Sequence, residues 1–180
     1  MTVFISGGCK NGKSSLAQNL AVTLSGSGKR YYVATMIPGD QEDRTRVARH
    51  VADRAGLGFE TIECGREILG CLSGADRAGC FLLDSVTALL ANEMFRPDGT
   101  VDLDAAPERV AAELRQFAGQ VGNAVFVSDF LYSDAGLFEE LTERYRRGLA
   151  RVDRALAECC DTVVEVCAGS YTMHKGALPL

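Results

Sequence analysis

The most chemically informative stretch of the sequence is a glycine-rich turn that ends in a lysine and a serine. Residues 7–14 read Gly-Gly-Cys-Lys-Asn-Gly-Lys-Ser, which fits the phosphate-binding P-loop pattern G-x-x-x-x-G-K-[ST]. In such a loop, backbone N–H groups surround phosphate oxygens and the lysine reaches the β- and γ-phosphates. The hydroxyl of the final residue binds Mg²⁺. We therefore expect Lys13 to act on phosphate and Ser14 to be a metal ligand.

The segments on either side of this loop have the form that its mechanism requires. An apolar, β-prone segment occupies residues 3–6, and Leu16, Leu20 and Leu24 follow the loop with helical spacing. A chance match in an ordinary strand–helix turn is the alternative, and the order of strand, turn and helix argues against it. The predicted nucleotide-binding residues of the loop are Gly7, Gly8, Cys9, Lys10, Asn11, Gly12, Lys13, Ser14 and Ser15.

A second candidate is the carboxylate that ends the apolar run at residues 80–84, Cys-Phe-Leu-Leu-Asp. Such a run is typical of a central parallel strand that is buried on both faces. Asp84 at its end is placed to hold Mg²⁺ directly or through water. The alternative is that Asp84 caps the helix expected to follow it. We favour the metal role.

His50 is a third candidate, and it is one of only two histidines in the chain. It lies on an expected helix at residues 41–55, with Arg46 one turn before it. A neutral imidazole there could attack phosphorus while nearby guanidinium groups hold phosphates. From spacing alone, a solvated histidine on a basic helix is the simpler interpretation. Residues Val47, Val51 and Ala55 form the apolar stripe that we expect this helix to bury.

Composition narrows the class of protein. The 180 residues suit a single domain, 1–180, with a substantial core. The net charge of −5 and the lack of a long basic run argue against nucleic acid as a partner. No apolar run approaches the length of a membrane span, and the P-loop begins at Gly7, where a signal peptide would lie. Seven cysteines without zinc-type spacing indicate a reducing compartment, and we expect a cytoplasmic protein.

Strand-like and helix-like segments alternate along the chain. This order predicts an α/β fold: a single P-loop NTPase-like domain whose mostly parallel sheet carries helices on both faces. We expect strands at 3–6, 31–35, 59–63, 80–84, 124–129 and 162–167, and helices after the P-loop and at 41–55, 66–72, 86–95, 104–121 and 137–159. The remaining residues, 168–180, are expected to form a tail. Ligands of such sheets bind at the carboxyl ends of the strands, which brings the P-loop, Thr35, Asp84 and Asp129 to one edge.

Five segments together resemble the bifunctional adenosylcobinamide kinase / adenosylcobinamide-phosphate guanylyltransferase family of cobalamin biosynthesis. The combination of an Ala-Thr pair with an Arg-x-x-x-His helix is more specific than the P-loop, and the matches cover nearly the whole chain. The matching segments are the P-loop at 7–14, Tyr-Val-Ala-Thr at 32–35, Arg-Val-Ala-Arg-His at 46–50, Leu-Leu-Asp-Ser-Val-Thr at 82–87 with Asn-Glu-Met-Phe at 92–95, and Tyr-Arg-Arg-Gly-Leu at 145–149.

The resemblance implies a two-step activity. Family members phosphorylate adenosylcobinamide with ATP or GTP, then transfer GMP from GTP to adenosylcobinamide phosphate through a histidine–GMP intermediate, giving adenosylcobinamide-GDP. It implies that His50 is the nucleophile, that Arg46, Arg49 and Thr35 join the P-loop in binding nucleotide, and that Ser14 and Asp84 hold Mg²⁺. It also implies nucleotide and corrinoid substrates and a homo-oligomer, often a trimer.

Two departures from the family pattern leave other functions open. Residues 128–132 read Ser-Asp-Phe-Leu-Tyr where the family usually has Ser-Asn-Glu-Val-Gly, and Asp153 stands where an asparagine is usual. One alternative is a P-loop kinase of another small alcohol that forms no covalent intermediate. The other is a nucleotide-binding or sensing protein without catalysis. The purine preference and the retention of both activities are left open by the sequence.

Overall fold

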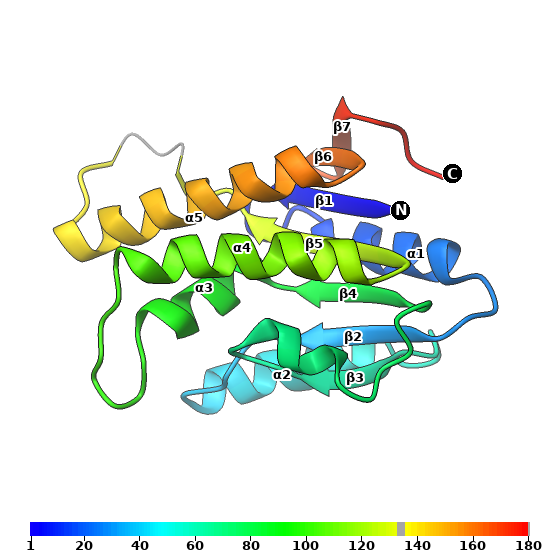
Figure 1. The fold of residues 1–180 in the computed structure, drawn as a ribbon, viewed down its shortest axis with the longest axis horizontal. Coiled ribbons are helices and arrows are strands. Elements are labelled where there is room, and N and C mark those ends of the chain that lie inside the picture. The colour runs from blue at the N-terminus through cyan, green and yellow to red at the C-terminus, as the bar shows by residue number, and fades with distance from the viewer. Residues whose placement is uncertain (133–135, 180) are drawn as a thin grey trace.

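A seven-stranded sheet lies at the centre of the computed structural model, which describes residues 1–132 and 136–179 apart from the side chain of Arg46 (Figure 1). Its strand order is β3-β2-β4-β5-β1-β6-β7. Neighbouring strands are parallel except β6 and β7, which are antiparallel. The strands are β1 (Thr2–Gly7), β2 (Arg30–Ala34), β3 (Glu60–Glu63), β4 (Cys80–Asp84), β5 (Asn123–Asp129), β6 (Thr162–Cys167) and β7 (Ser170–Lys175).

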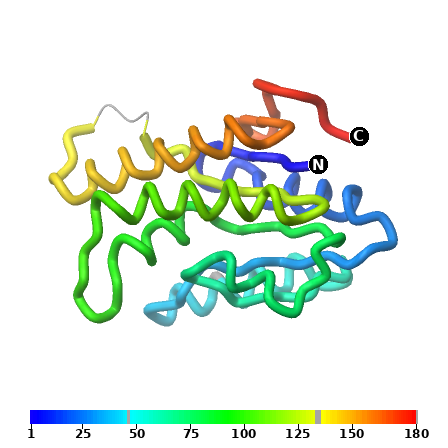
Figure 2. The backbone as a smooth tube through the Cα atoms, in the orientation of Figure 1, coloured from blue at the N-terminus to red at the C-terminus, as the bar shows by residue number. Residues whose placement is uncertain are grey.

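Helices cover both faces of this sheet. In Figure 1, α4 and α5 lie in front of the sheet, and α1 lies behind it. The backbone trace in Figure 2 shows the chain leaving the middle of the sheet after β1, reaching β2 and β3 at one edge, and returning through β4 and β5 to the other side. The helices are α1 (Lys13–Ser25), α2 (Gln41–Asp53), α3 (Val86–Met94), α4 (Ala105–Gln120) and α5 (Glu140–Cys159), with a short 3-10 helix η1 at Ile68–Leu72.

The core has two parts because successive strand residues face opposite sides of the sheet. In β4, Phe81 and Leu83 belong to the apolar cluster beneath α3, α4 and α5, while Leu82 belongs to the cluster beneath α1. Phe81 lies edge-on to Phe117 of α4, with 5.5 Å between the ring centroids. Burying an aromatic or aliphatic side chain of this size contributes about 1.5–3 kcal/mol. The expectation of a central strand buried on both faces is confirmed.

The buried face of α2 differs from the apolar stripe expected from the sequence. Val51 is 49% exposed, and Ala55 lies beyond the end of the helix. Arg54, which directly follows the last residue of α2, is instead only 8% exposed. Its guanidinium lies over the ring of Tyr32 at 4.0 Å from the centroid. A cation with a long apolar stem thus takes the inward position, because the guanidinium group and stem of Arg54 can cover the aromatic face of Tyr32.

The expected tail at 168–180 contains a strand, which corrects the sequence interpretation. Residues Cys167 and Ser170 pair across a two-residue turn, and β7 continues antiparallel to β6. Both turn residues have positive φ, 50° at Ala168 and 79° at Gly169. Such hairpin turns usually carry Asn or Asp before the glycine, so the alanine gave no signal.

Two further helices differ from their expected bounds by two residues or more, whereas α3 and α4 agree with theirs to within one residue. The helix expected over 137–159 begins three residues later, at Glu140. The helix expected over 66–72 is a 3-10 helix over Ile68–Leu72. Among the residues that the structure describes, no helix combines the length and the apolar character that crossing a membrane requires.

Candidate nucleotide-binding and catalytic site

The glycine-rich loop leaves the end of β1 and leads directly into α1. Gly12 precedes the helix in the left-handed conformation, with φ 91°, and within the described chain no side chain caps the helix start. The first backbone N–H groups of α1 are therefore available to an anion. Gly7 must be a glycine, because a Cβ there would lie 2.3 Å from the carbonyl oxygen of Val166 in β6.

Lys13 folds back into this loop and is only 6% exposed. Its Nζ donates to the carbonyl oxygen of Gly8 at 2.6 Å and to Oδ1 of Asp129 at 2.9 Å. Both acceptors are oxygens of the kind that a phosphate group presents. The lysine is thus held at the mouth of the loop by groups that phosphate oxygens can replace.

Ser14 and Asp84 meet on the neighbouring side of the site. The Ser14 hydroxyl donates to Oδ2 of Asp84 at 3.2 Å, and the Tyr32 hydroxyl donates to the same oxygen at 2.9 Å. Burial, reinforced by the negative charge of Asp84, raises the pKa of Tyr32, so this hydroxyl stays a donor. A serine hydroxyl and a carboxylate side by side are the hard oxygen donors that Mg²⁺ prefers. This donor set fits the expected metal.

The capping role considered for Asp84 falls to its neighbour. The Ser85 side chain accepts from the backbone N–H of Ala88 at 3.2 Å and caps α3. Thr35 holds Ser85 in turn: its hydroxyl donates to the Ser85 carbonyl and accepts from the Ser85 N–H, both at 2.7 Å. Thr35 is fully buried. Its contacts are those of a residue that positions the end of β4.

Asn92 of α3 connects the same edge to the next loop. Its side-chain amide donates to the carbonyl oxygens of Thr35, at 2.8 Å, and of Gly65, at 2.9 Å. The segments that follow β2 and β3 are therefore tied to the helix that follows β4. Asn92 of the Asn-x-x-Phe segment noted in the sequence therefore holds these loops together.

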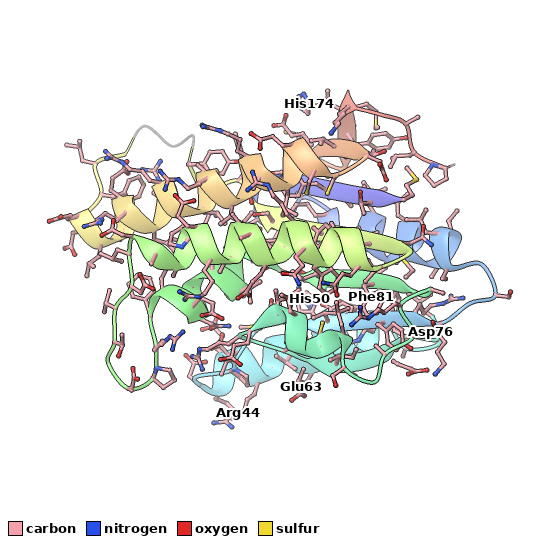
Figure 3. The ribbon with its side chains drawn as sticks, viewed as in Figure 1. Arg44, His50, Glu63, Asp76, Phe81 and His174 are labelled. Atoms are coloured by element: carbon pink, nitrogen blue, oxygen red, sulfur yellow. The ribbon has the colours of Figure 1, made fainter. Side chains whose placement is uncertain are left out.

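Helix α2 carries the histidine and the two arginines expected to act on nucleotide. Asp40 caps it, accepting from the Asp43 N–H at 2.8 Å. Arg49 is exposed and His50 is half-buried. Figure 3 shows His50 and Arg44 on this helix, with Arg44 directed away from the rest of the chain. Within the described residues, no hydrogen bond or ion pair joins His50 or Arg49 to the P-loop.

Arg54, the residue after the end of α2, connects this helix to the strands beside Asp84. Besides covering the Tyr32 ring, it donates from Nη2 to the Thr61 hydroxyl of β3 at 3.1 Å. Tyr32 itself contacts Asp84. His50 lies four residues before Arg54, on the same side of the helix and nearer to its start. His50 therefore lies about one turn before the residue that reaches Tyr32.

A buried carboxyl group that sequence reasoning did not assign to the site lies on the other side of β5. Asp153 of α5 is 2% exposed, and its Oδ2 accepts from the hydroxyls of Ser128, at 3.0 Å, and Tyr132, at 3.2 Å. Burial raises the pKa of Asp153 to about 7. Its Oδ1 and the Ser6 hydroxyl are buried without a hydrogen-bond partner among the described residues. The only sequence signal was that Asp153 and residues 128–132 both depart from the family pattern.

The fold and the loop define the chain as a P-loop α/β nucleotide-binding protein. The family described as cobinamide kinase / cobinamide phosphate guanyltransferase matches residues 3–173. The bifunctional adenosylcobalamin biosynthesis protein CobP of Pseudomonas aeruginosa is 32% identical over 177 residues, which cover 98% of each chain. The chain belongs to this family. The resemblance read from the motifs is confirmed, and with it the prediction of a kinase and guanylyltransferase.

Solved structures confirm the fold class. A protein of Pyrococcus horikoshii superposes with a TM-score of 0.53 at 11% identity, covering 99% of this chain and 87% of its own. An ATPase of a bacterial type III secretion system gives a TM-score of 0.51 at 12% identity, covering 92% of this chain and 51% of its own. At this identity the likeness concerns the fold alone. It agrees with the mostly parallel sheet expected from the sequence.

Proposed function

We propose that residues 1–180 act as one domain that phosphorylates adenosylcobinamide with ATP or GTP. The same domain then transfers GMP from GTP to adenosylcobinamide phosphate through a GMP adduct on His50. The observation that carries the proposal is the contact of Ser14 with Asp84 beside Lys13, in a chain that belongs to this enzyme family. It brings together the cation and the hard oxygen donors that phosphoryl transfer needs.

In the phosphorylation step, the P-loop and Lys13 hold the β- and γ-phosphates. The free N–H groups at the start of α1 face the phosphate oxygens, and Lys13 releases Gly8 and Asp129 to bind them. Ser14 and Asp84 are the ligands proposed for Mg²⁺, which when bound neutralises charge on the phosphates. Thr35 serves this site through Ser85, because it holds the backbone next to Asp84.

In the guanylyl step, His50 is the nucleophile. A neutral imidazole nitrogen attacks the α-phosphorus of GTP, the bond to the bridging oxygen breaks, and pyrophosphate leaves. Arg46 and Arg49 are proposed to hold phosphate groups during this step. Support comes from Arg54, four residues after His50, which stacks on Tyr32, the hydrogen-bond partner of Asp84.

We also propose a cytoplasmic, oligomeric protein with a corrinoid substrate. All seven cysteines are free, which suits a reducing compartment. Large apolar side chains are exposed before and at the start of α5: Leu137 is 104% and Leu141 is 51% exposed. Such a patch suits an interface between copies of the chain, and the family resemblance suggests a trimer.

The decisive experiment separates the two reactions by mass and by substitution. Wild-type protein incubated with GTP and Mg²⁺ is expected to gain the mass of one GMP, and the adduct should be lost in mild acid and kept in base, as a phosphoramidate is. His50→Ala should form no adduct and transfer no GMP, yet still phosphorylate adenosylcobinamide. His50→Asn, similar in shape but not nucleophilic, should behave in the same way.

Lys13→Ala is the control, because it should lose both reactions while remaining folded. An adduct recovered on His50→Ala protein, or one that survives mild acid, would show that another residue is the nucleophile. Phosphorylation of another small alcohol by a wild-type protein that forms no adduct would support the simple-kinase alternative. Nucleotide binding without turnover would support a sensor.

A further inference from the structure

The carboxylate of Asp129 lies at the mouth of the P-loop and is not one of the two ligands, Ser14 and Asp84, proposed for the metal. Its Oδ1 is 2.9 Å from Nζ of Lys13, and its side chain is 27% exposed. Ser14, by contrast, contacts Asp84. Of the two acids at this edge, Asp84 contacts the hydroxyl proposed to bind the metal, and Asp129 contacts the ammonium group proposed to bind phosphate.

Strand register places Asp129 farther out than Asp84. In the β4–β5 pairing, Asp84 lies beside Val127, and in the β1–β5 pairing Asp129 lies beside Gly7. Asp129 therefore stands two residues, about 7 Å, beyond the level of Asp84 along the strand direction. Both side chains lie on the face that α1 covers, because Val127 belongs to the cluster beneath α1 and residues two apart share a face.

The backbone of Asp129 is held from two sides. Its N–H donates to the Thr87 hydroxyl of α3 at 2.8 Å. The next N–H, of Phe130, donates to the carbonyl oxygen of Gly7 at 3.0 Å. The backbone that carries the carboxylate is therefore fixed beside the loop, as a group that must meet a substrate in a defined geometry requires.

We propose that Asp129 is the proton acceptor for the acceptor hydroxyl in the phosphorylation step and has no role in guanylyl transfer. This inference rests on the proposed function. The hydroxyl oxygen forms a bond to the γ-phosphorus, and the bond from that phosphorus to the β–γ bridging oxygen breaks. The electron pair stays on the nucleoside diphosphate, and the hydroxyl proton passes to the Asp129 carboxylate.

The position of Lys13 explains why Asp129 reaches this proton. Asp129 is one hydrogen bond from Nζ of Lys13, so a γ-phosphate that takes over this ammonium group would lie beside the carboxylate that it displaces. A hydroxyl that attacks the γ-phosphorus approaches from outside the loop to about 3–3.5 Å. A carboxylate on that side is within hydrogen-bond reach of it, which is the geometric requirement for a general base.

The other reaction has no proton for this carboxylate to accept. The attacking imidazole nitrogen of His50 uses its lone pair and carries no hydrogen. In the second half of guanylyl transfer the attacking group is a phosphate oxygen, which is already ionised near neutral pH. A base role for Asp129 therefore predicts that the two activities separate, whereas a role in holding Lys13 predicts that both fall together.

The test compares both half-reactions in Asp129→Asn, which keeps the shape of the side chain. The kcat for phosphorylation of adenosylcobinamide should fall about 10²- to 10⁴-fold, the usual range for a lost general base. The KM for ATP should stay within about threefold, because Asn removes only an anion that competes for Lys13. The rate of GMP-adduct formation should also stay within about threefold. Asp129→Glu, which keeps a carboxylate, should phosphorylate faster than Asp129→Asn.

Asp153→Asn is the matched control, since it removes a carboxyl group on the opposite face of β5, and it should keep both activities. Phosphorylation by Asp129→Asn within fivefold of wild type would overturn the inference. Equal loss of both half-reactions, or loss of nucleotide binding, would overturn it too, because the carboxylate would then act through the P-loop. Failure of the proposed function has a different signature, namely wild-type protein that lacks one or both reactions.

Discussion

Replacing Asp153 by asparagine should stabilise the protein, and the gain should grow with pH. The Asp153 carboxyl is almost completely buried between α5 and β5, and two hydroxyls, of Ser128 and Tyr132, donate to one of its oxygens. Burial raises its pKa to about 7, with these hydrogen bonds only partly opposing the shift. Asparagine keeps an oxygen for the hydroxyls and never carries a charge.

The magnitude follows from the two pKa values. In the unfolded chain the Asp153 carboxyl releases its proton near the ordinary value of 3.8, and in the folded chain near 7. The folded state therefore binds more protons than the unfolded state between these values, so the free energy of unfolding of the wild type falls as pH rises from about 4 to about 7. At about 1.4 kcal/mol per pH unit, the total is on the order of 4 kcal/mol.

Urea unfolding at pH 5, 6, 7 and 8 measures this effect. The stability difference between Asp153→Asn and wild type should increase from pH 5 to pH 7 and level off above it. Asp161→Asn is the control: Thr2 donates its backbone N–H to Asp161 and holds the pKa of that carboxyl below its ordinary value. The stability due to Asp161 is present above about pH 4 and lost only below it, so its variant should differ from wild type by a constant amount over this range. A gain from Asp153→Asn that is equal at pH 5 and pH 8 would refute the reasoning.

Two further substitutions test the proposed roles of the site. Asp84→Asn should slow both half-reactions and raise the Mg²⁺ concentration needed for half-maximal activity, because an amide is a poor ligand for a hard cation; an unchanged magnesium titration would contradict the proposed role of Asp84 as a metal ligand. Arg54→Ala should cost about 2 kcal/mol of stability through the lost contact with Tyr32 and slow GMP-adduct formation on His50 at least tenfold more than phosphorylation. Equal slowing of both reactions would show that Arg54 does not act by placing α2.

The sheet was predictable because each strand carries its own signal. The run from Cys80 to Asp84 is apolar on both faces and is buried as expected. The face of α2 was not predictable, because its inward position at Arg54 depends on Tyr32, a residue distant in sequence. A helical pattern identifies apolar positions, and it gives no sign of a cation that will stack on a ring. The hairpin at β7 was missed for a local reason, since its turn uses alanine at a position that favours asparagine.

The site was predictable where a motif carries its own geometry. The P-loop implies the placement of Lys13 and Ser14, and strand order implies that Asp84 lies at the same edge. The pairing of Lys13 with Asp129 needed the register of β1 against β5, which no single segment encodes. The position of His50 depends on how α2 is anchored, which is again a contact between separate elements.

The residues at the two departures from the family pattern contact each other in the structure. Strand alternation turns Ser128 toward α5, where its hydroxyl donates to Asp153, and turns Asp129 toward the P-loop, where its carboxylate accepts from Lys13. Tyr132, the last residue of the altered segment, also donates to Asp153. The aspartate at position 153 is therefore accompanied by two hydroxyl donors that face it, and the acid at position 129 contacts the P-loop lysine, Lys13. Although the altered segment has Phe130 where the family usually has glutamate, it still places a carboxylate, that of Asp129, beside Lys13. This placement is what the proposed role of Asp129 in the kinase step requires.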